Sequence, residues 1–137
     1  MQQALSEARQ AAEEGEVPVG AVVVSGDRII ARAHNQTERL SDPTAHAEML
    51  AITAATGALG AKYLTECRLY VTVEPCVMCA GAIGWAQLAG VVYGAPDEKR
   101  GFTIYAPHAL HPKTSVSCGV LEAECAAVMQ IFFRNKR

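Results

Sequence analysis

The chain has 137 residues, of which 50% are hydrophobic and 19% are charged, and its formal net charge is −2. This length predicts a single domain over residues 1–137, large enough to fold without a disulfide. The charge excludes binding of nucleic acid by bulk positive charge, and no apolar run approaches the roughly 20 residues that span a membrane. The acid-rich first residues are unlike a signal peptide, so we expect a cytoplasmic location and no membrane partner.

Apolar periodicity and turn residues predict four elements in the first half of the chain. These are a helix over residues 2–14 that ends at Gly15, a strand that ends at Val24, a turn over residues 25–27, a return strand through Ala33, and a helix that begins at Asp42, Pro43 or Thr44 and ends at Gly57 or Gly60. The two strands, joined by a short turn, form a hairpin.

The second half alternates strands and helices. The expected elements are a strand over residues 67–74, a helix that opens at Pro75 and runs to Leu88, a strand over residues 90–95, a weaker strand over residues 115–121, and a closing helix over residues 122–135. The strand at 67–74 is mostly apolar, which is typical of a central strand buried on both faces. The whole order predicts a layered α/β domain with helices on both faces of the sheet.

Two thiols stand three positions apart in "VTVEPCVMCAGA". Cys76 and Cys79 would lie in the first turn of a helix, where the helix dipole favours the thiolate that a metal needs. A redox pair and two buried apolar residues are the alternatives. The chain has no second C-x-x-C, and the other cysteines stand among apolar neighbours, where we expect burial: Cys67, Cys118 and Cys125.

Histidine is the other ligand type that zinc favours. His34 ends a strand, and His108 and His111 lie in a proline-flanked loop that is either a second metal site or solvated. His46 begins a helix, and Glu48 follows two residues later. For both to reach one site, that site must lie off the N-terminal end of the helix, because residues i and i+2 point to different sides.

His46, Cys76 and Cys79 together predict a zinc site with three protein ligands. Three ligands leave a fourth position open, which is typical of a catalytic zinc ion whose bound water has a pKa near 7. The two thiolates balance the charge of the metal, so Glu48 is free to move protons. We therefore expect Glu48 to be the catalytic acid and base.

The pattern H-x-E followed by P-C-x-x-C resembles the signature of the zinc-dependent nucleobase deaminases. Over most of the chain the sequence is also similar to the bacterial tRNA-specific adenosine deaminases, which form inosine at the wobble position of the anticodon. The segments that carry this resemblance are "EVPVGAVVV", "DPTAHAEM", "LYVTVEPCVMCAGAI", "VVYGA" and "GVLEAECAAVMQIFFRNKR". The resemblance implies a three-layer α/β/α cytidine deaminase-like domain with a five-stranded mixed sheet, one Zn²⁺ per subunit, a homodimer and a tRNA anticodon stem-loop as substrate.

The resemblance also implies further site residues. Asn35 would contact the target base, although an Asx turn at a strand end is the alternative for this residue. The other implied substrate-binding residues are Val17, Pro18 and Ala47. The implied RNA contacts are Asp97, Lys99, Phe133, Arg134 and Arg137. The basic residues among them have an equally open alternative: Arg134 and Arg137 would be solvated at a helix end, and Lys99 would be solvated in a loop.

Two other functions stay open on the sequence. A zinc-dependent deaminase of a free base or nucleoside, such as guanine or cytosine, would share every catalytic residue. A zinc-stabilised binding module without turnover would need neither the open metal position nor Glu48. The basic end of "FFRNKR" favours RNA over a free base.

Overall fold

The computed structural model describes residues 1–136, so the predicted RNA contact Arg137 lies outside the described residues. The elements are α1 (Gln2–Glu13), β1 (Gly20–Ser25), β2 (Arg28–His34), α2 (Ala47–Leu59), β3 (Cys67–Val73), α3 (Val77–Ala86), β4 (Gly90–Ala95), α4 (Phe102–Tyr105), β5 (Ser115–Cys118) and α5 (Glu122–Asn135). Within residues 1–136, no helix is both long and apolar enough to cross a membrane.

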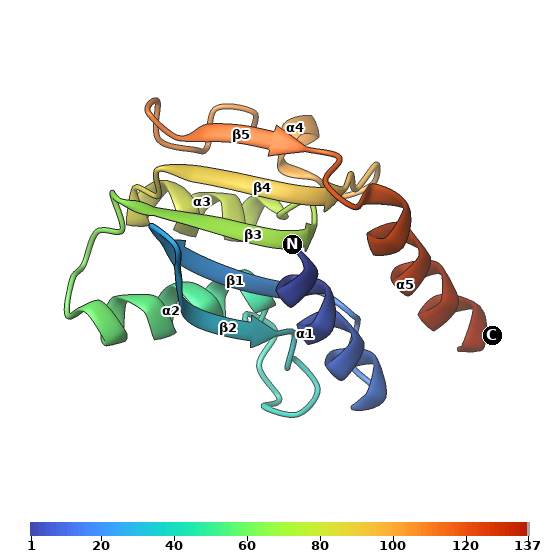
Figure 1. Cartoon of the computed structure of the whole chain (residues 1–137). Helices are drawn as coiled ribbons and strands as arrows, with labels where there is room; N and C mark the ends of the chain where they lie inside the picture. Colours follow the sequence, from blue (N-terminus) through green and yellow to red (C-terminus); the bar gives the residue numbers. More distant parts are fainter. Residues whose placement is uncertain (137) are drawn as a thin grey trace.

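The five strands form one mixed sheet in the order β2-β1-β3-β4-β5. The β1 strand pairs antiparallel with β2 and β3, whereas β3, β4 and β5 run parallel. Helices α1 and α5 contact one face of the sheet, and α2 covers the other face beside α3 (Figure 1). This arrangement confirms the predicted three-layer fold with a mixed sheet and β3 at its centre.

The main core lies between the sheet and the α2–α3 layer. Alternate strand residues point into it, as the two-residue period of a strand requires. The strand members are Ala21, Val23, Ala31, Ala33, Cys67, Leu69, Val71, Val91 and Tyr93, and the helix members are Ala47, Ala51, Ala55, Ala80, Ile83, Ala86 and Phe102. The many alanines let the helix axes lie close to the sheet, which fixes the ends of α2 and α3 relative to the strands.

On the opposite face α1 packs directly on strand backbone. A side chain at Gly20 would collide with the carbonyl oxygen of Ala4 and the backbone nitrogen of Ala8, so only glycine fits this position. Helix α1 ends at Glu13, and Gly15, with a φ of 80°, turns the chain just after it, which confirms the predicted end of this helix. A smaller apolar cluster of Leu5, Ala95 and Cys125 joins α1 and α5 on this face.

The predicted start of α2 is wrong by several residues. The helix begins at Ala47, with His46 as its N-cap. The Asp42 carboxylate accepts hydrogen bonds from the backbone and hydroxyl of Thr44, at 2.8 Å and 2.7 Å, so the residues that look like a helix start close a separate turn. Gly60, with a φ of 61°, ends the helix as predicted.

Three further predictions need correction. Helix α3 begins at Val77 rather than Pro75, because Cys76 is its extended N-cap, and it ends at Ala86. Strand β5 stops at Cys118, since Gly119 turns the chain with a φ of 84°. Cys118 is exposed on this edge strand, not buried as expected, whereas the predicted burial of Cys67 and Cys125 is confirmed. The short helix α4 was not predicted.

Candidate active site

The structure brings His46, Cys76 and Cys79 together, with their ligand atoms all within 4.8 Å of one another. The Nδ1 atom of His46 lies 3.7 Å from Sγ of Cys76 and 3.6 Å from Sγ of Cys79. Tetrahedral zinc, with bonds of about 2.0 Å to nitrogen and 2.3 Å to sulfur, separates such ligand atoms by roughly 3.6 Å. Both nitrogen–sulfur distances therefore fit zinc, as the sequence predicts.

Two helix N-termini define this cluster. His46 is the N-cap of α2 and Cys76 is the N-cap of α3, while Cys79 lies in the first turn of α3. The unpaired N–H groups at a helix start carry partial positive charge and favour anionic ligands. This arrangement also explains how His46 and Glu48, two residues apart, can reach one site. His46 is the N-cap and lies beyond the end of α2, whereas Glu48 lies in the first turn of the helix.

The ionisation of the two thiols is strongly coupled. Hydrogen bonding from the Cys79 thiol, and then from His46, lowers the pKa of Cys76 to about 4. The hydrogen bond to Cys76, together with burial, raises the pKa of Cys79. Two thiolates this close need a positive partner, which is what a divalent cation supplies. The chemistry of the donor set therefore also fits a metal ion.

Glu48 is 4% exposed in the first turn of α2. Burial is the main cause that raises the pKa of its carboxyl group to about 7. A general acid and base works best when its pKa is near the working pH, because both forms are then populated. The environment of Glu48 therefore suits the predicted proton transfer.

A cavity of about 270 Å³ joins Glu48 to the metal-ligand cluster. Its lining residues are Val17, Val19, Asn35, Thr37, His46, Ala47, Glu48, Val73, Glu74, Cys76, Asp97, Arg100 and Met129. The predicted substrate contacts Val17, Asn35 and Ala47 are therefore on its wall. Pro18 is fully buried and does not line the cavity.

Asn35 is 7% exposed, and its Oδ1 atom is the one buried side-chain polar atom without a hydrogen-bond partner among residues 1–136. An Asx turn would require this atom to accept a backbone N–H, so the structure does not show that alternative. A buried acceptor without a partner costs free energy, which a ligand donor in the cavity would recover. The Asn35 side chain is thus available to a substrate.

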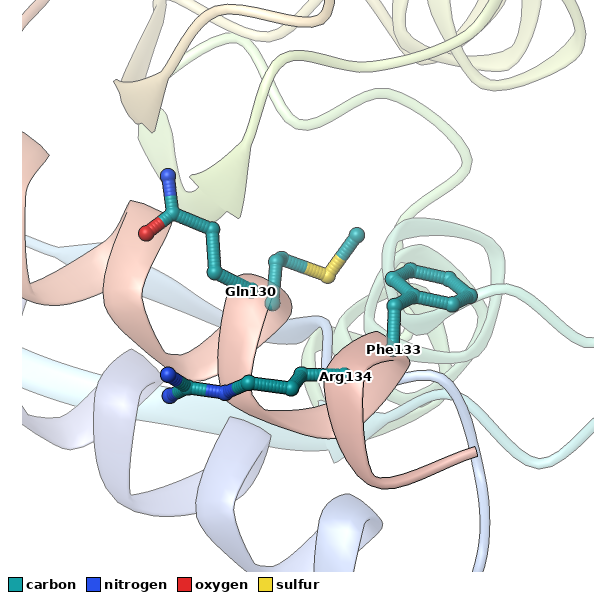
Figure 2. Close-up of a pocket in the computed structure, with 4 residues that line it drawn as sticks. Gln130, Phe133 and Arg134 are labelled. Atoms are coloured by element: carbon teal, nitrogen blue, oxygen red, sulfur yellow. The ribbon is translucent and has the colours of Figure 1, made fainter. Parts of the chain in front are cut away.

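Two of the predicted RNA contacts, Asp97 and Lys99, line the cavities beside His46 and Cys76. Lys99 lines a second cavity of about 630 Å³ beside His46 and Cys76, whereas the Asp97 carboxylate accepts the backbone N–H groups of Lys99 and Arg100, each at 3.0 Å. On α5, Phe133 and Arg134 line a shallow surface hollow. Figure 2 shows the Phe133 ring and the Arg134 guanidinium pointing away from each other.

Several cavity residues were missed by the sequence analysis. Val19 follows Val17 at strand spacing, and Arg100 is adjacent to the predicted contact Lys99; both are signals that could have been used. Met129 carries no such signal, because its place beside the site depends on how α5 packs. His108 is exposed and belongs to no metal-ligand cluster among the described residues, so the second metal site is not formed.

A family model described as MafB19-like deaminase matches residues 1–137. The chain is 45% identical to a tRNA-specific adenosine deaminase of Agrobacterium fabrum over 142 residues, which cover 100% of this chain and 93% of that protein. A solved structure from work on A-to-I editing by tRNA:A34 deaminases at the wobble position of transfer RNA has a TM-score of 0.87 and 45% identity, covering 93% of this chain and 96% of the other. A guanine deaminase structure from Bacillus subtilis has a TM-score of 0.66 and 43% identity, with 69% of this chain and 61% of the other covered.

Fold and site together define a nucleobase deaminase, as the sequence predicts. The chain belongs to the MafB19-like deaminase family.

Proposed function

We propose that this enzyme converts adenosine to inosine at the wobble position of a tRNA anticodon loop. The observation that carries the proposal is a single cavity lined by Glu48, by Asn35, whose Oδ1 has no partner, and by His46 and Cys76 of the metal-ligand cluster. Residues 1–137 would form one zinc-dependent deaminase domain with one Zn²⁺ per subunit. We also propose a cytoplasmic location, with which a tRNA substrate is consistent.

The chemistry follows from the positions of these groups. A zinc ion bound by His46, Cys76 and Cys79 would lower the pKa of a bound water molecule to about 7 and so supply the nucleophile. Glu48 takes a proton from the attacking water and delivers it to ring N1 of adenine. It then takes the second proton of that water from the hydroxyl newly formed on C6 and passes it to the amine; the C6–N bond breaks, ammonia leaves, and inosine with a C6 carbonyl remains. Asn35 holds the base in the cavity through its free acceptor.

RNA binding is supported by the surroundings of the cavity. The target nucleotide must leave its stack to enter, and loop nucleotides are those for which this costs least. Lys99 and Arg100 lie at the cavity mouth, and the half-exposed ring of Phe133 is available for stacking on a neighbouring base. These local groups act in place of bulk charge, since the net charge is −2.

We also propose a homodimer formed through α3 and α4, which contact each other. Large apolar side chains are exposed on both helices: Val77 at 44%, Trp85 at 84%, Ile104 at 50% and Tyr105 at 66%. Exposed apolar surface of this kind typically marks a protein interface, and tryptophan is enriched among the residues that dominate binding. The resemblance described in the sequence analysis implies a homodimer, so a second copy of the chain is the first partner to test.

The competing function is deamination of a free base. The structural similarity to a guanine deaminase of Bacillus subtilis favours it as the second candidate. A direct test incubates the protein with an anticodon stem-loop that carries adenosine at the wobble position, and in parallel with free adenosine, guanine and cytosine. Inosine in the RNA alone, lost in Glu48→Ala, supports the proposal. Ammonia released from a free base, with no inosine in the RNA, would replace it with the second candidate.

A further inference from the structure

Glu74 is a buried carboxylate that the chemistry above does not use. It lies at the end of β3, two residues before Cys76, and is 5% exposed. Its Oε1 accepts the backbone N–H of Asp97 at 3.1 Å, and its Oε2 accepts the backbone N–H and the hydroxyl of Thr103, at 3.1 Å and 2.7 Å. No ion pair joins Glu74 to a basic side chain within residues 1–136. The carboxylate is thus satisfied entirely by residues 97–103, which comprise the connection after β4 and the first two residues of α4 and which we call the β4–α4 loop.

Backbone contacts extend this connection. The Phe102 N–H donates to the Pro75 carbonyl at 2.9 Å, and Cys76 forms an isolated antiparallel bridge with Gly101. A side chain at Gly101 would collide with the Glu74 carboxylate, so the backbone and the carboxylate are in close contact. The turn that presents the first thiol and the β4–α4 loop are therefore held as one unit.

The same loop carries the basic side chains at the cavity mouth. Asp97 accepts the backbone N–H groups of Lys99 and Arg100, so its carboxylate shapes the loop. Arg100 lines both cavities, and Lys99 lines the outer one beside Cys76. Because β3 and β4 are parallel, both segments leave the same edge of the sheet, which places this loop next to the thiols.

We propose that Glu74 is a positioning residue for nucleic-acid binding, acting through the β4–α4 loop. By fixing that loop to the thiol-bearing turn, it presents Lys99 and Arg100 to the phosphates that flank the nucleotide in the cavity. Holding the loop in its binding conformation lowers the ordering cost of association. This role rests on the proposed function, since it requires an RNA substrate.

The first test replaces Glu74 by glutamine, which keeps the shape but presents an amide donor to backbone donors. Zinc content is expected to stay at the wild-type level and kcat within about threefold. The KM for the stem-loop should rise at least ~10-fold. The slope of log KM against log salt concentration should fall by about one, which corresponds to the loss of one phosphate contact. A Glu74→Gln enzyme whose KM and salt dependence match the wild type overturns the proposal.

A double-mutant cycle tests the route of action. If Glu74 acts through the basic side chains, Glu74→Gln changes KM less than about twofold in a Lys99→Ala/Arg100→Ala background. The same fold-change in both backgrounds would show that Glu74 acts elsewhere. Thr103→Val removes one of the three hydrogen bonds and should raise KM by a smaller factor. Thr114→Val is its matched control, because that hydroxyl bonds the Leu88 carbonyl away from the loop.

Trypsin supplies a measurement that needs no RNA. Loosening the β4–α4 loop should speed cleavage after Lys99 or Arg100 at least ~10-fold in Glu74→Gln, since proteolysis follows local opening. Unchanged cleavage would mean that Glu74 does not hold the loop. A wild-type protein that acts on no RNA removes the proposed function together with this role, whereas RNA activity with an unaltered Glu74→Gln enzyme removes only the role of Glu74.

Discussion

The Sγ atom of Cys76 lies 3.7 Å from the Nδ1 atom of His46, although thirty positions separate the two residues in the chain. Each is the N-cap of a helix, so α2 and α3 direct their N-termini at one point. Neither side chain caps its own helix by a hydrogen bond. Both N-cap side chains are thus free to bind a metal ion, and the two helix N-termini stabilise negative charge between them.

Glu48→Ala should keep its zinc and lose turnover. General acid–base catalysis contributes roughly 10²- to 10⁴-fold, so we expect kcat to fall by at least ~100-fold. Elemental analysis and inosine formation measure the two properties on one preparation. Glu13→Ala, at an exposed glutamate of α1, is the control. Near-normal turnover in Glu48→Ala would disprove the role of this residue.

Cys76→Ser should lose the metal. The serine hydroxyl does not ionise near neutral pH, so it cannot replace the thiolate ligand. We expect about one zinc ion per chain in the wild type and less than about a tenth of that in the variant, with a lower melting temperature. Cys118→Ser, at an exposed cysteine, should keep its zinc. Full zinc content in Cys76→Ser would contradict the ligand assignment.

Asn35→Ala should reduce activity without destabilising the fold. Its Oδ1 accepts no hydrogen bond in the free protein, so the fold loses none at this atom when it is removed. A substrate hydrogen bond worth about 1.4 kcal/mol or more corresponds to a loss of at least ~10-fold in kcat/KM. Steady-state kinetics and urea unfolding separate the two effects. A variant that loses stability but keeps kcat/KM would give Asn35 a purely structural role, and Asn135→Ala on α5 is the control.

Trp85→Glu should weaken the homodimer. A central tryptophan typically contributes about 2 kcal/mol or more to an interface, which corresponds to at least ~30-fold in the dimer dissociation constant. Sedimentation velocity over a range of concentrations measures this constant. Leu59→Glu replaces an exposed apolar residue at the far end of α2 and should leave the dimer intact. If both variants dimerise like the wild type, the interface lies elsewhere.

His34 should make stability depend on pH. Its ring nitrogens lie 3.0 Å from the Glu7 carboxylate and 3.1 Å from the Glu14 carboxylate. Burial lowers the pKa of His34, but these two hydrogen bonds outweigh it and leave the pKa above 6.5. A raised pKa in the folded state means that the stabilisation is complete below pH 6.5 and is lost as the pH rises through the folded value.

The matched measurement is urea unfolding of the wild type and His34→Gln between pH 5.5 and 8.5. The wild type should lose stability with rising pH relative to the variant. The hydrogen bond to His34 lowers the pKa of Glu14. The contribution of Glu14 to the free energy of unfolding is therefore complete above the ordinary glutamate pKa, and it is lost only in acid, as the pH falls through the lowered value. Parallel curves for the two proteins would contradict a charged His34.

The sequence predicts the order of helices and strands along the chain, apart from α4, and the trio His46, Cys76 and Cys79 that the structure brings together, because both depend on short patterns. Spacing identifies His46, Cys76 and Cys79 without any knowledge of packing. The start of α2 was misplaced because the Asp42–Thr44 turn uses the same residue types as a helix cap. A carboxylate at the end of an apolar strand, Glu74, was a signal left unused, since a buried charge must find partners.

Met129 and Cys118 illustrate what sequence patterns cannot supply. Met129 reaches the cavity only because α5 packs on β3 and β4, and helix periodicity cannot say which apolar side chain will line a site. Cys118 looks like a core residue among apolar neighbours but lies on an edge strand. Both depend on which elements become neighbours, and that is decided by tertiary packing.

The sheet order leaves β2 and β5 as open edges, which bears on aggregation. An exposed strand edge can pair with another chain unless charge or shortness prevents it. The β2 edge carries the exposed side chains of Arg28 and Arg32, and burying these charges against a second strand would be costly. The β5 edge is only four residues long. We therefore expect fibre formation in variants that lengthen β5 or that replace Arg28 and Arg32 by apolar residues.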